Sequence, residues 1–254
     1  MCQYGGRLRQ EDVAFQARLY ADPNPTRRGL HLDRRAWVIA QFDRYGGRGC
    51  RAVEVGVGCG TFSLEMASRQ FRVSAVDINP AFLDHLAGNA RIDAYQLDAT
   101  NPLGIGQHDL ALCSEVLEHV DPARSQGMID SLFDALRPGG LLILSTPQAY
   151  SVVELLSRLF RFGPFLALAR RLYGQAEELG HINLLTAGAV EAQLHRAGFE
   201  IVSATRFGFY LPAIAEFGGM AGWRALRSTG RWLARVPVLR GLLWTQGWVV
   251  RRPA

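Results

Sequence analysis

The sequence predicts an α/β fold, a three-layer sandwich in which helices cover both faces of a mostly parallel β-sheet. Short apolar segments alternate with helical segments from Arg51 to Pro147, as they do in right-handed βαβ units. A glycine-rich stretch, "VEVGVGCG", ends the first apolar segment, where α/β sheets bring the backbone close to a ligand. The hydrophobic content of 48% is ordinary for one sizeable core.

Each helix and strand is expected from a local pattern in the sequence. Residues 32–45 have helical periodicity, with Asp33 as the expected cap. Pro80 fits the first turn of a later helix, and "RPGG" is expected to stop another. In order, the core then reads as strand "RAVEVG", helix "TFSLEMASRQ", strand "RVSAVDI", helix "NPAFLDHLAGNA", strand "IDAYQLDA", strand "HDLALCSEVLEHV", helix "DPARSQGMIDSLFDAL" and strand "LLILSTP".

The rhythm changes after Pro147. Residues Ser151 to Gly174 are expected to be mostly helical, followed by helix "LTAGAVEAQLHRAG" and strand "FEIVSATRF". A basic helix is expected from Trp223 to Arg235, and "LLWTQGWVVRRP" is typical of a last strand. We therefore expect a single domain over residues 1–254. Its expected parts are an N-terminal helical segment (1–49), a ligand-binding core (50–147), a helical cap (148–185) and a C-terminal part with the basic helix (186–254).

Composition favours a cytoplasmic protein. The four cysteines form no CxxC pair, no stretch of about 18 residues is free of charge, and the N-terminus lacks the apolar core of a signal peptide. Charge is uneven, because residues 52–150 hold 12 acidic residues and 5 arginines, whereas residues 199–254 hold 8 arginines and 2 glutamates. All 28 basic residues are arginine, which a GC-rich genome explains without reference to function.

Three kinds of ligand were considered for the glycine-rich stretch. A Walker loop requires lysine, and the chain has none. A dinucleotide loop requires its third small residue at position 61, whereas Gly60 comes one position early. Glu54, two residues before the first glycine, would repel a pyrophosphate but suits a ligand that carries an ammonium or sulfonium group.

Five motifs in order resemble those of the class I S-adenosylmethionine-dependent methyltransferases, of the broad group of small-molecule and ubiquinone O-methyltransferases. They are "VEVGVGCG", "VSAVDIN", "YQLDAT", "DLALCSEVLEHV" and "LRPGGLLILSTP", with a further match in "GHINLLTAGAVEAQLHRAGFEIV". The resemblance implies a seven-stranded sheet whose last strand is antiparallel and inserted beside the fifth. It also implies S-adenosylmethionine as cofactor and S-adenosylhomocysteine as product. The cofactor-binding residues that it implies are Glu54, Gly56, Gly58, Gly60, Asp77, Ile78, Asp98, Ala99, Ser114 and Glu115.

These residue types suit the cofactor. Glycines let the chain pass beneath the methionine and ribose portions, and a carboxylate at Asp77 can accept hydrogen bonds from both ribose hydroxyls. Other interpretations stay open, because Asp77 could cap the helix that follows and Asp98 could stabilise a turn rather than contact the adenine.

Two histidines are candidate catalytic residues. His119 follows the fourth strand, where it could take a proton from the acceptor or orient the cofactor pocket; His181 lies at the end of the cap. The pattern Glu115-x-x-Glu118-His119 is similar to a cluster that ligates a divalent metal in some related enzymes, although it also occurs in enzymes that use no metal. We expect no metal site.

The predicted cap and the basic helix indicate which acceptor and which partners to expect. The apolar residues from Val152 to Leu172 favour a hydrophobic or aromatic small-molecule acceptor, with O-methylation expected. Arginines 224, 227, 231 and 235 fit peripheral contact with an anionic membrane, or a solvated helix face; nucleic acid is disfavoured because no recognised RNA module is present. The alternatives are a lipid-linked acceptor at the membrane surface, a Rossmann-type NAD(P)-dependent oxidoreductase and a non-catalytic cofactor-binding protein.

Overall fold

A seven-stranded sheet runs through the middle of the molecule. The computed structural model describes residues 17–159 and 182–254, and its strands lie in the order β3-β2-β1-β4-β5-β7-β6. The neighbouring pairs from β3 to β5 are parallel, whereas β7 is antiparallel to both β5 and β6. The strands are β1 (Arg51–Val55), β2 (Arg72–Asp77), β3 (Ile92–Gln96), β4 (His108–Ser114), β5 (Leu136–Pro147), β6 (Glu200–Phe207) and β7 (Thr245–Arg251). The expected α/β fold and the antiparallel last strand beside β5 are confirmed.

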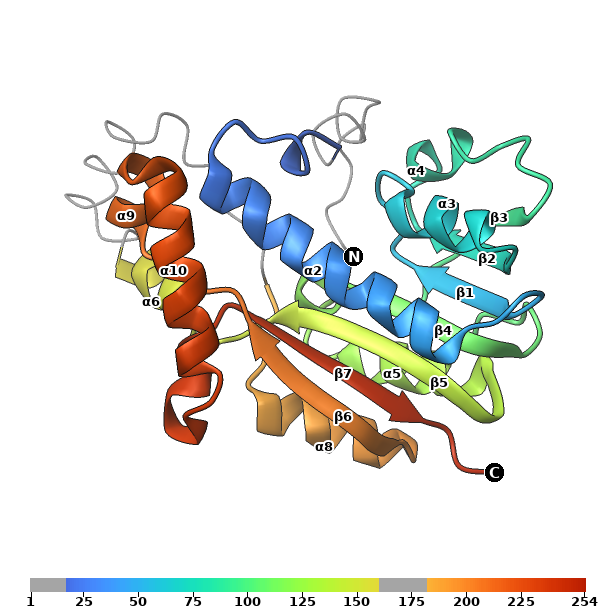
Figure 1. The fold of residues 1–254 in the computed structure, drawn as a ribbon. Coiled ribbons are helices and arrows are strands. Elements are labelled where there is room, and N and C mark those ends of the chain that lie inside the picture. The colour runs from blue at the N-terminus through green and yellow to red at the C-terminus, as the bar shows by residue number, and fades with distance from the viewer. Residues whose placement is uncertain (1–16, 160–181) are drawn as a thin grey trace.

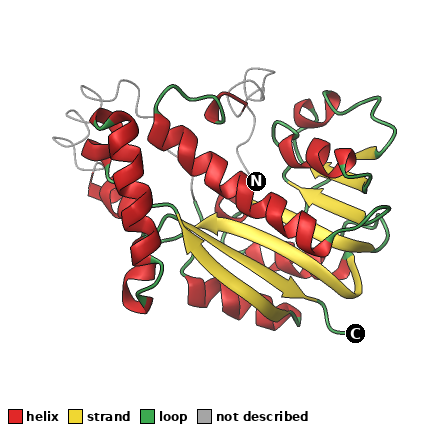
Figure 2. Cartoon of the chain, viewed as in Figure 1, coloured by secondary structure: helices red, strands yellow, loops and turns green. Residues whose placement is uncertain are grey.

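Helices cover both faces of this sheet (Figure 1). They are α2 (Pro25–Tyr45), α3 (Thr61–Ser68), α4 (Ala81–Asp84), α5 (Ser125–Asp134), α6 (Val152–Leu159), α8 (Ala187–Ala197), α9 (Pro212–Phe217) and α10 (Gly219–Leu233), with the short 3₁₀ helices η1 (Leu117–His119) and η2 (Pro237–Leu242). Figure 2 shows the resulting layers, with strands between helices.

Two hydrophobic cores lie between the sheet and the helices, one on each face of the sheet. On one face, α2 and α3 bury Val38, Phe42, Phe62 and Met66 against the sheet. On the other face, α5 and α8 bury Ile129, Leu132, Val190 and Leu194. Alternation along β1 serves both cores, because Ala52 belongs to the first core and Val53 and Val55 to the second. The buried parallel strands therefore read as continuous apolar runs in the sequence.

Two local predictions were wrong. Asp33 does not cap a helix, because α2 begins eight residues earlier, at Pro25. The N-cap is Asn24, whose side chain accepts hydrogen bonds from the Thr26 and Arg27 N–H groups. The helix expected over "NPAFLDHLAGNA" is only α4, because the chain turns at Gly88, where φ is +87°.

The expected cap is described only in part. Its first residues form α6, and the rest of the predicted helical segment lies outside the described residues, as does His181. Within the described ranges, no helix is long and apolar enough to cross a membrane.

Candidate functional site

The loop between β1 and α3 contains three glycines in left-handed backbone conformations. Gly56, Gly58 and Gly60 all have positive φ, at 77°, 54° and 73°. A Cβ atom on Gly56 would lie 2.2 Å from Val116 Cγ2, and one on Gly60 would lie 2.5 Å from His85 Nε2. The sequence therefore specifies a bare backbone loop at the carboxyl end of β1, and the expected glycines come together there.

Asp77 ends β2 beside this loop. Its Oδ2 atom accepts a hydrogen bond from Gly58 N–H at 3.4 Å, and its Oδ1 atom accepts one from Asn79 N–H at 2.9 Å. Burial raises the pKa of Asp77, although these backbone donors oppose the shift. The alternative role as a helix cap is wrong, because α4 has Pro80 at its N-cap position and no side-chain cap.

Glu54 lies behind the loop rather than within it. Glu54 is 2% exposed, and its carboxyl accepts a hydrogen bond from Ser63 Oγ of α3 at 2.5 Å. Burial raises the pKa of Glu54 to about 8, and the nearby Asp77 acts in the same direction. A positively charged ligand in this region would offset that burial cost, which agrees with the interpretation made from the sequence.

Three further residues expected to bind the cofactor, Ile78, Asp98 and Ala99, have different surroundings. Ile78 follows β2 with 64% of its surface exposed, whereas the Ala99 side chain belongs to the core. Asp98 accepts hydrogen bonds from the Thr100 N–H and Oγ1 groups, and it forms an ion pair with Arg124 at 2.8 Å. Burial opposes the shift, but these donors lower the pKa of Asp98. Asp98 therefore stabilises its own turn, the second role considered above.

A polar cluster follows β4 at the same edge of the sheet. Glu115 has a φ of +58°, which is unusual for a residue other than glycine. Its Oε1 atom accepts a hydrogen bond from Ser145 Oγ at 3.1 Å, and Ser145 Oγ lies 2.9 Å from Ser114 Oγ. Arg34 of α2 forms an ion pair with Glu115 at 3.0 Å. Burial opposes the shift, but Glu115 raises the pKa of Arg34 above its ordinary value.

The other two residues of the motif, Glu118 and His119, have different surroundings. Glu118 is buried, accepts a hydrogen bond from Thr146 Oγ1 at 3.0 Å, and through its backbone oxygen binds the N–H groups of Ile182 and Asn183. Burial raises the pKa of Glu118 well above its ordinary value, and the Glu115 charge adds to the shift. The His119 side chain is exposed at the end of η1.

These residues do not fit a metal site. The Arg34 guanidinium already neutralises Glu115, and Glu118 is held by Thr146. Within residues 17–159 and 182–254, no three His, Cys, Asp or Glu side chains converge to hold a metal ion.

Two further side chains in this region had no role predicted from the sequence. His31 and Arg34 lie one turn apart on α2, with His31 Nδ1 at 3.4 Å from Arg34 Nη2. The His31 ring makes edge contacts with the rings of Tyr20 and Trp244. Burial and the Arg34 charge lower the pKa of His31 to about 3. The helical spacing of the two residues was visible in the sequence, but nothing in it showed that this face of α2 meets β4.

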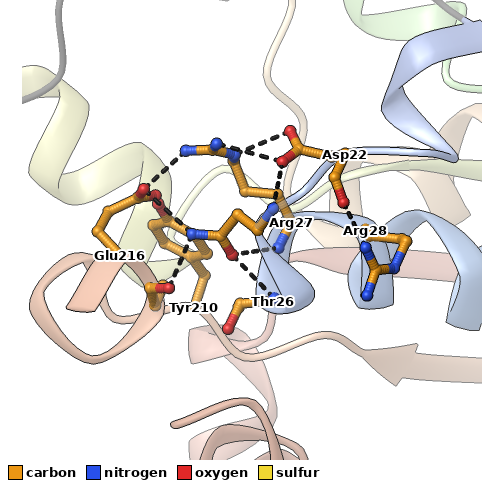
Figure 3. Close-up of polar contacts among 8 residues, drawn as sticks. Asp22, Thr26, Arg27, Arg28, Tyr210 and Glu216 are labelled. Carbon is orange, nitrogen blue, oxygen red and sulfur yellow. Dashed lines mark hydrogen bonds and ion pairs between the residues drawn. The ribbon is translucent and has the colours of Figure 1, made fainter. Parts of the chain in front are cut away.

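Contacts at the start of α2 hold this helix against α9 (Figure 3). Arg27 pairs with Asp22 at 2.9 Å and with Glu216 of α9 at 2.7 Å. The Asn24 amide donates a hydrogen bond to Ala215 O at 3.0 Å, and Tyr210 Oη donates one to Glu216 Oε1 at 2.5 Å. The N-terminal helix is thereby fixed across the sheet end, with Arg34 facing Glu115.

Comparison with known proteins agrees with the fold. A ubiquinone biosynthesis O-methyltransferase of Psychrobacter cryohalolentis is 33% identical over 116 residues, which are 40% of this chain and 44% of that protein. The N-methyltransferase NodS from Bradyrhizobium japonicum, solved with S-adenosyl-L-homocysteine, is 17% identical over 96% of each chain, with a TM-score of 0.59. The magnesium protoporphyrin IX methyltransferase from Synechocystis, also solved with S-adenosyl-L-homocysteine, is 18% identical over 94% of each chain, with a TM-score of 0.60.

The fold is that of the class I methyltransferases, whose cofactor is S-adenosylmethionine. Residues 19–204 match the family described as the methyltransferase domain, and the chain belongs to that family. The oxidoreductase considered from the sequence is thereby set aside. The chain spans about half the length of the curated relatives it matches.

Proposed function

We propose that this chain transfers a methyl group from S-adenosylmethionine to an oxygen atom of a small hydrophobic or aromatic acceptor and releases S-adenosylhomocysteine. One observation carries the proposal. The Asp77 carboxylate lies against the glycine loop at the carboxyl ends of β1 and β2, with its Oδ2 atom 3.4 Å from Gly58 N. In open α/β sheets this edge is where ligands bind.

The chain's own groups suit each part of the cofactor. The bare loop at Gly56 and Gly60 leaves room for the methionine and ribose portions, and Asp77 offers a carboxylate to the ribose hydroxyls. Ile78 offers an exposed apolar surface to the adenine, and Glu54 offers a carboxyl behind the ammonium group. The bound cofactor would supply an electrophilic methyl group on a sulfonium.

The acceptor would lie beside the polar cluster after β4. Tyr20 and Trp244 contribute aromatic rings there, and the Arg34–Glu115 ion pair contributes fixed charges. Methylation of a hydroxyl forms an O–C bond, breaks an S–C bond and releases one proton. A nitrogen with a pKa of about 3 binds protons weakly, so His31 can accept a hydrogen bond but is a poor base. His119 is our candidate base, with His181 as a second.

Two features support this type of acceptor. The matched relatives from Psychrobacter and Xanthomonas are named as O-methyltransferases, which favours oxygen as the methylated atom. The apolar segment that begins with α6 favours a hydrophobic acceptor. A lipid-linked acceptor at a membrane surface meets the same conditions and is the second candidate.

The test uses S-adenosylmethionine with a labelled methyl group, the purified protein and an extract of the source cells. After reaction the extract is partitioned, and the label is counted in the organic and aqueous phases. We expect label in the organic phase, and none with an Asp77→Ala control. Label confined to the aqueous phase would contradict a hydrophobic acceptor. Cofactor binding by calorimetry without label in either phase would instead indicate a non-catalytic protein.

A further inference from the structure

One face of the molecule combines exposed arginines with exposed apolar side chains. It is formed by α9, α10 and η2, and we call it the arginine-rich face. The exposed fractions of its apolar residues are high: 74% for Phe217, 51% for Met220, 57% for Trp232 and 90% for Val238. Arg224 and Arg231 are exposed on α10, and Arg235 is exposed in the short segment between α10 and η2. Single exposed apolar residues are ordinary, but these four lie on three consecutive elements of the chain, with the exposed arginines between them in the sequence.

The apolar side of α10 is already used within the protein. Gly222, Leu226, Gly230 and Leu233 are its buried residues. Trp223 packs on Gly29 of α2, where an added Cβ would lie 2.4 Å from the indole ring. Met220 and Trp232 are not among these buried residues and stay exposed on α10.

The charge of this face selects the partner. Residues 212–242, from α9 to η2, contain five arginines and one acidic residue, Glu216, which is paired with Arg27. Arg227 pairs with Asp33 of α2 at 2.8 Å, whereas Arg224, Arg231 and Arg235 form no ion pair with any described residue. The complementary partner is anionic and also takes up apolar side chains. An anionic lipid bilayer has both properties, because its headgroups are charged and its interior is apolar.

A nucleic acid matches this chemistry less well. Its phosphates would pair with arginine, and bases would stack on Trp232 or Phe217. Met220 and Val238 are aliphatic and offer no stacking surface, yet Val238 is the most exposed of the four apolar residues. The side chains therefore favour a bilayer over a nucleic acid.

The position of the face fits this partner. In Figure 1, α9 and α10 stand at the end of the sheet toward which β5 points, and Glu115 follows β4 at that same end. The Arg27–Glu216 ion pair ties α9 to α2, which carries Arg34 (Figure 3). Docking through this face would therefore hold the carboxyl edge of the sheet near the lipid surface.

We propose that the arginine-rich face docks on an anionic lipid bilayer. The bilayer would be the source of a hydrophobic acceptor, and only this last step rests on the proposed function. Docking itself needs neither cofactor nor acceptor, so it is measured without them.

The experiment is co-sedimentation of the full chain with large vesicles of phosphatidylcholine, alone or with about a third phosphatidylglycerol. We expect binding to the anionic vesicles only, weakened by added salt. The variant R224E/R231E/R235E should bind at least about 100-fold more weakly, since each arginine near such a surface contributes about fivefold. The variant F217S/W232S should bind about 10-fold more weakly to the same vesicles.

A matched control carries the same change in net charge on another part of the surface. Arg48, Arg72 and Arg91 are exposed near the amino ends of β1, β2 and β3, and R48E/R72E/R91E should bind within about threefold of the unmodified chain. Circular dichroism confirms that each variant is folded. Equal binding to neutral vesicles, equal loss in the control, or no binding to anionic vesicles would overturn the proposal. So would tighter binding to a single-stranded RNA than to the vesicles at the same salt concentration.

Discussion

Replacing Gly56 with alanine should destabilise the fold by about 3 kcal/mol, and the structure separates this cost into two parts. A φ of +77° costs an L-residue about 1–2 kcal/mol. The new Cβ would also lie 2.2 Å from Val116 Cγ2, well inside the ordinary contact distance, and such overpacking costs about 1–3 kcal/mol. Urea denaturation at constant m-value measures the sum as a midpoint lower by about 1 M.

Two companion variants test the division. Gly104 has a φ of +65° and no heavy atom within 4 Å of an added Cβ, so Gly104→Ala should cost only the backbone part, about 1 kcal/mol. Truncation in Val116→Ala removes the clashing methyl group and leaves the Val116 Cβ at 3.3 Å. In that background Gly56→Ala should also cost about 1 kcal/mol. If Gly56→Ala costs the same with and without the Val116 methyl groups, the reasoning from close approach is refuted.

Three further predictions follow from the site. Asp77→Ala should weaken S-adenosylmethionine binding by about 100-fold, because two charge-assisted hydrogen bonds are lost. Calorimetry measures this affinity, with the exposed Asp93→Ala as control. Unchanged affinity would contradict the assignment of Asp77. The pKa of Glu54 is raised from 4.5 to about 8, so the folded state binds more protons than the unfolded state between these values. Stability should therefore fall by about 5 kcal/mol as the pH rises through this window. Glu54→Gln should flatten that fall, and an unchanged slope would show that the carboxyl is ionised in the fold. Arg34→Met should cost about 3 kcal/mol by leaving Glu115 unpaired, whereas adding Glu115→Gln should recover part of that loss in a double-mutant cycle; additive losses would mean that the pair is not coupled.

The sequence could predict what depends on local pattern. Positive φ at Gly56, Gly58 and Gly60 is a property of the backbone that only glycine adopts freely. The three glycines therefore predict the loop from the sequence alone. Asp77 is found in the same way, because parallel strands end at a common edge and the acid ends the second strand.

The acceptor side could not be predicted in this way. The Arg34–Glu115 pair joins residues about eighty positions apart, and it depends on how α2 lies across the sheet. That placement in turn depends on α9, through Arg27 and Glu216. The N-cap of α2 was predicted wrongly for a related reason. Asp33 and Asn24 are both good N-cap residues, and Pro25 at the first helical position favours Asn24.

The position of β7 also bears on how the molecule assembles. Two strands depend on this one segment, because β5 has β7 as its outer neighbour and β6 has no other partner in the sheet. Leu144 of β5 pairs with Trp248, across about a hundred residues of intervening chain. Until residues 245–251 are in place, the edge of β5 stays open to pairing with other chains, and β6 cannot join the sheet at all. The last strand therefore acts as the closing element of this side of the sheet, because its pairing covers the edge of β5 and gives β6 a partner.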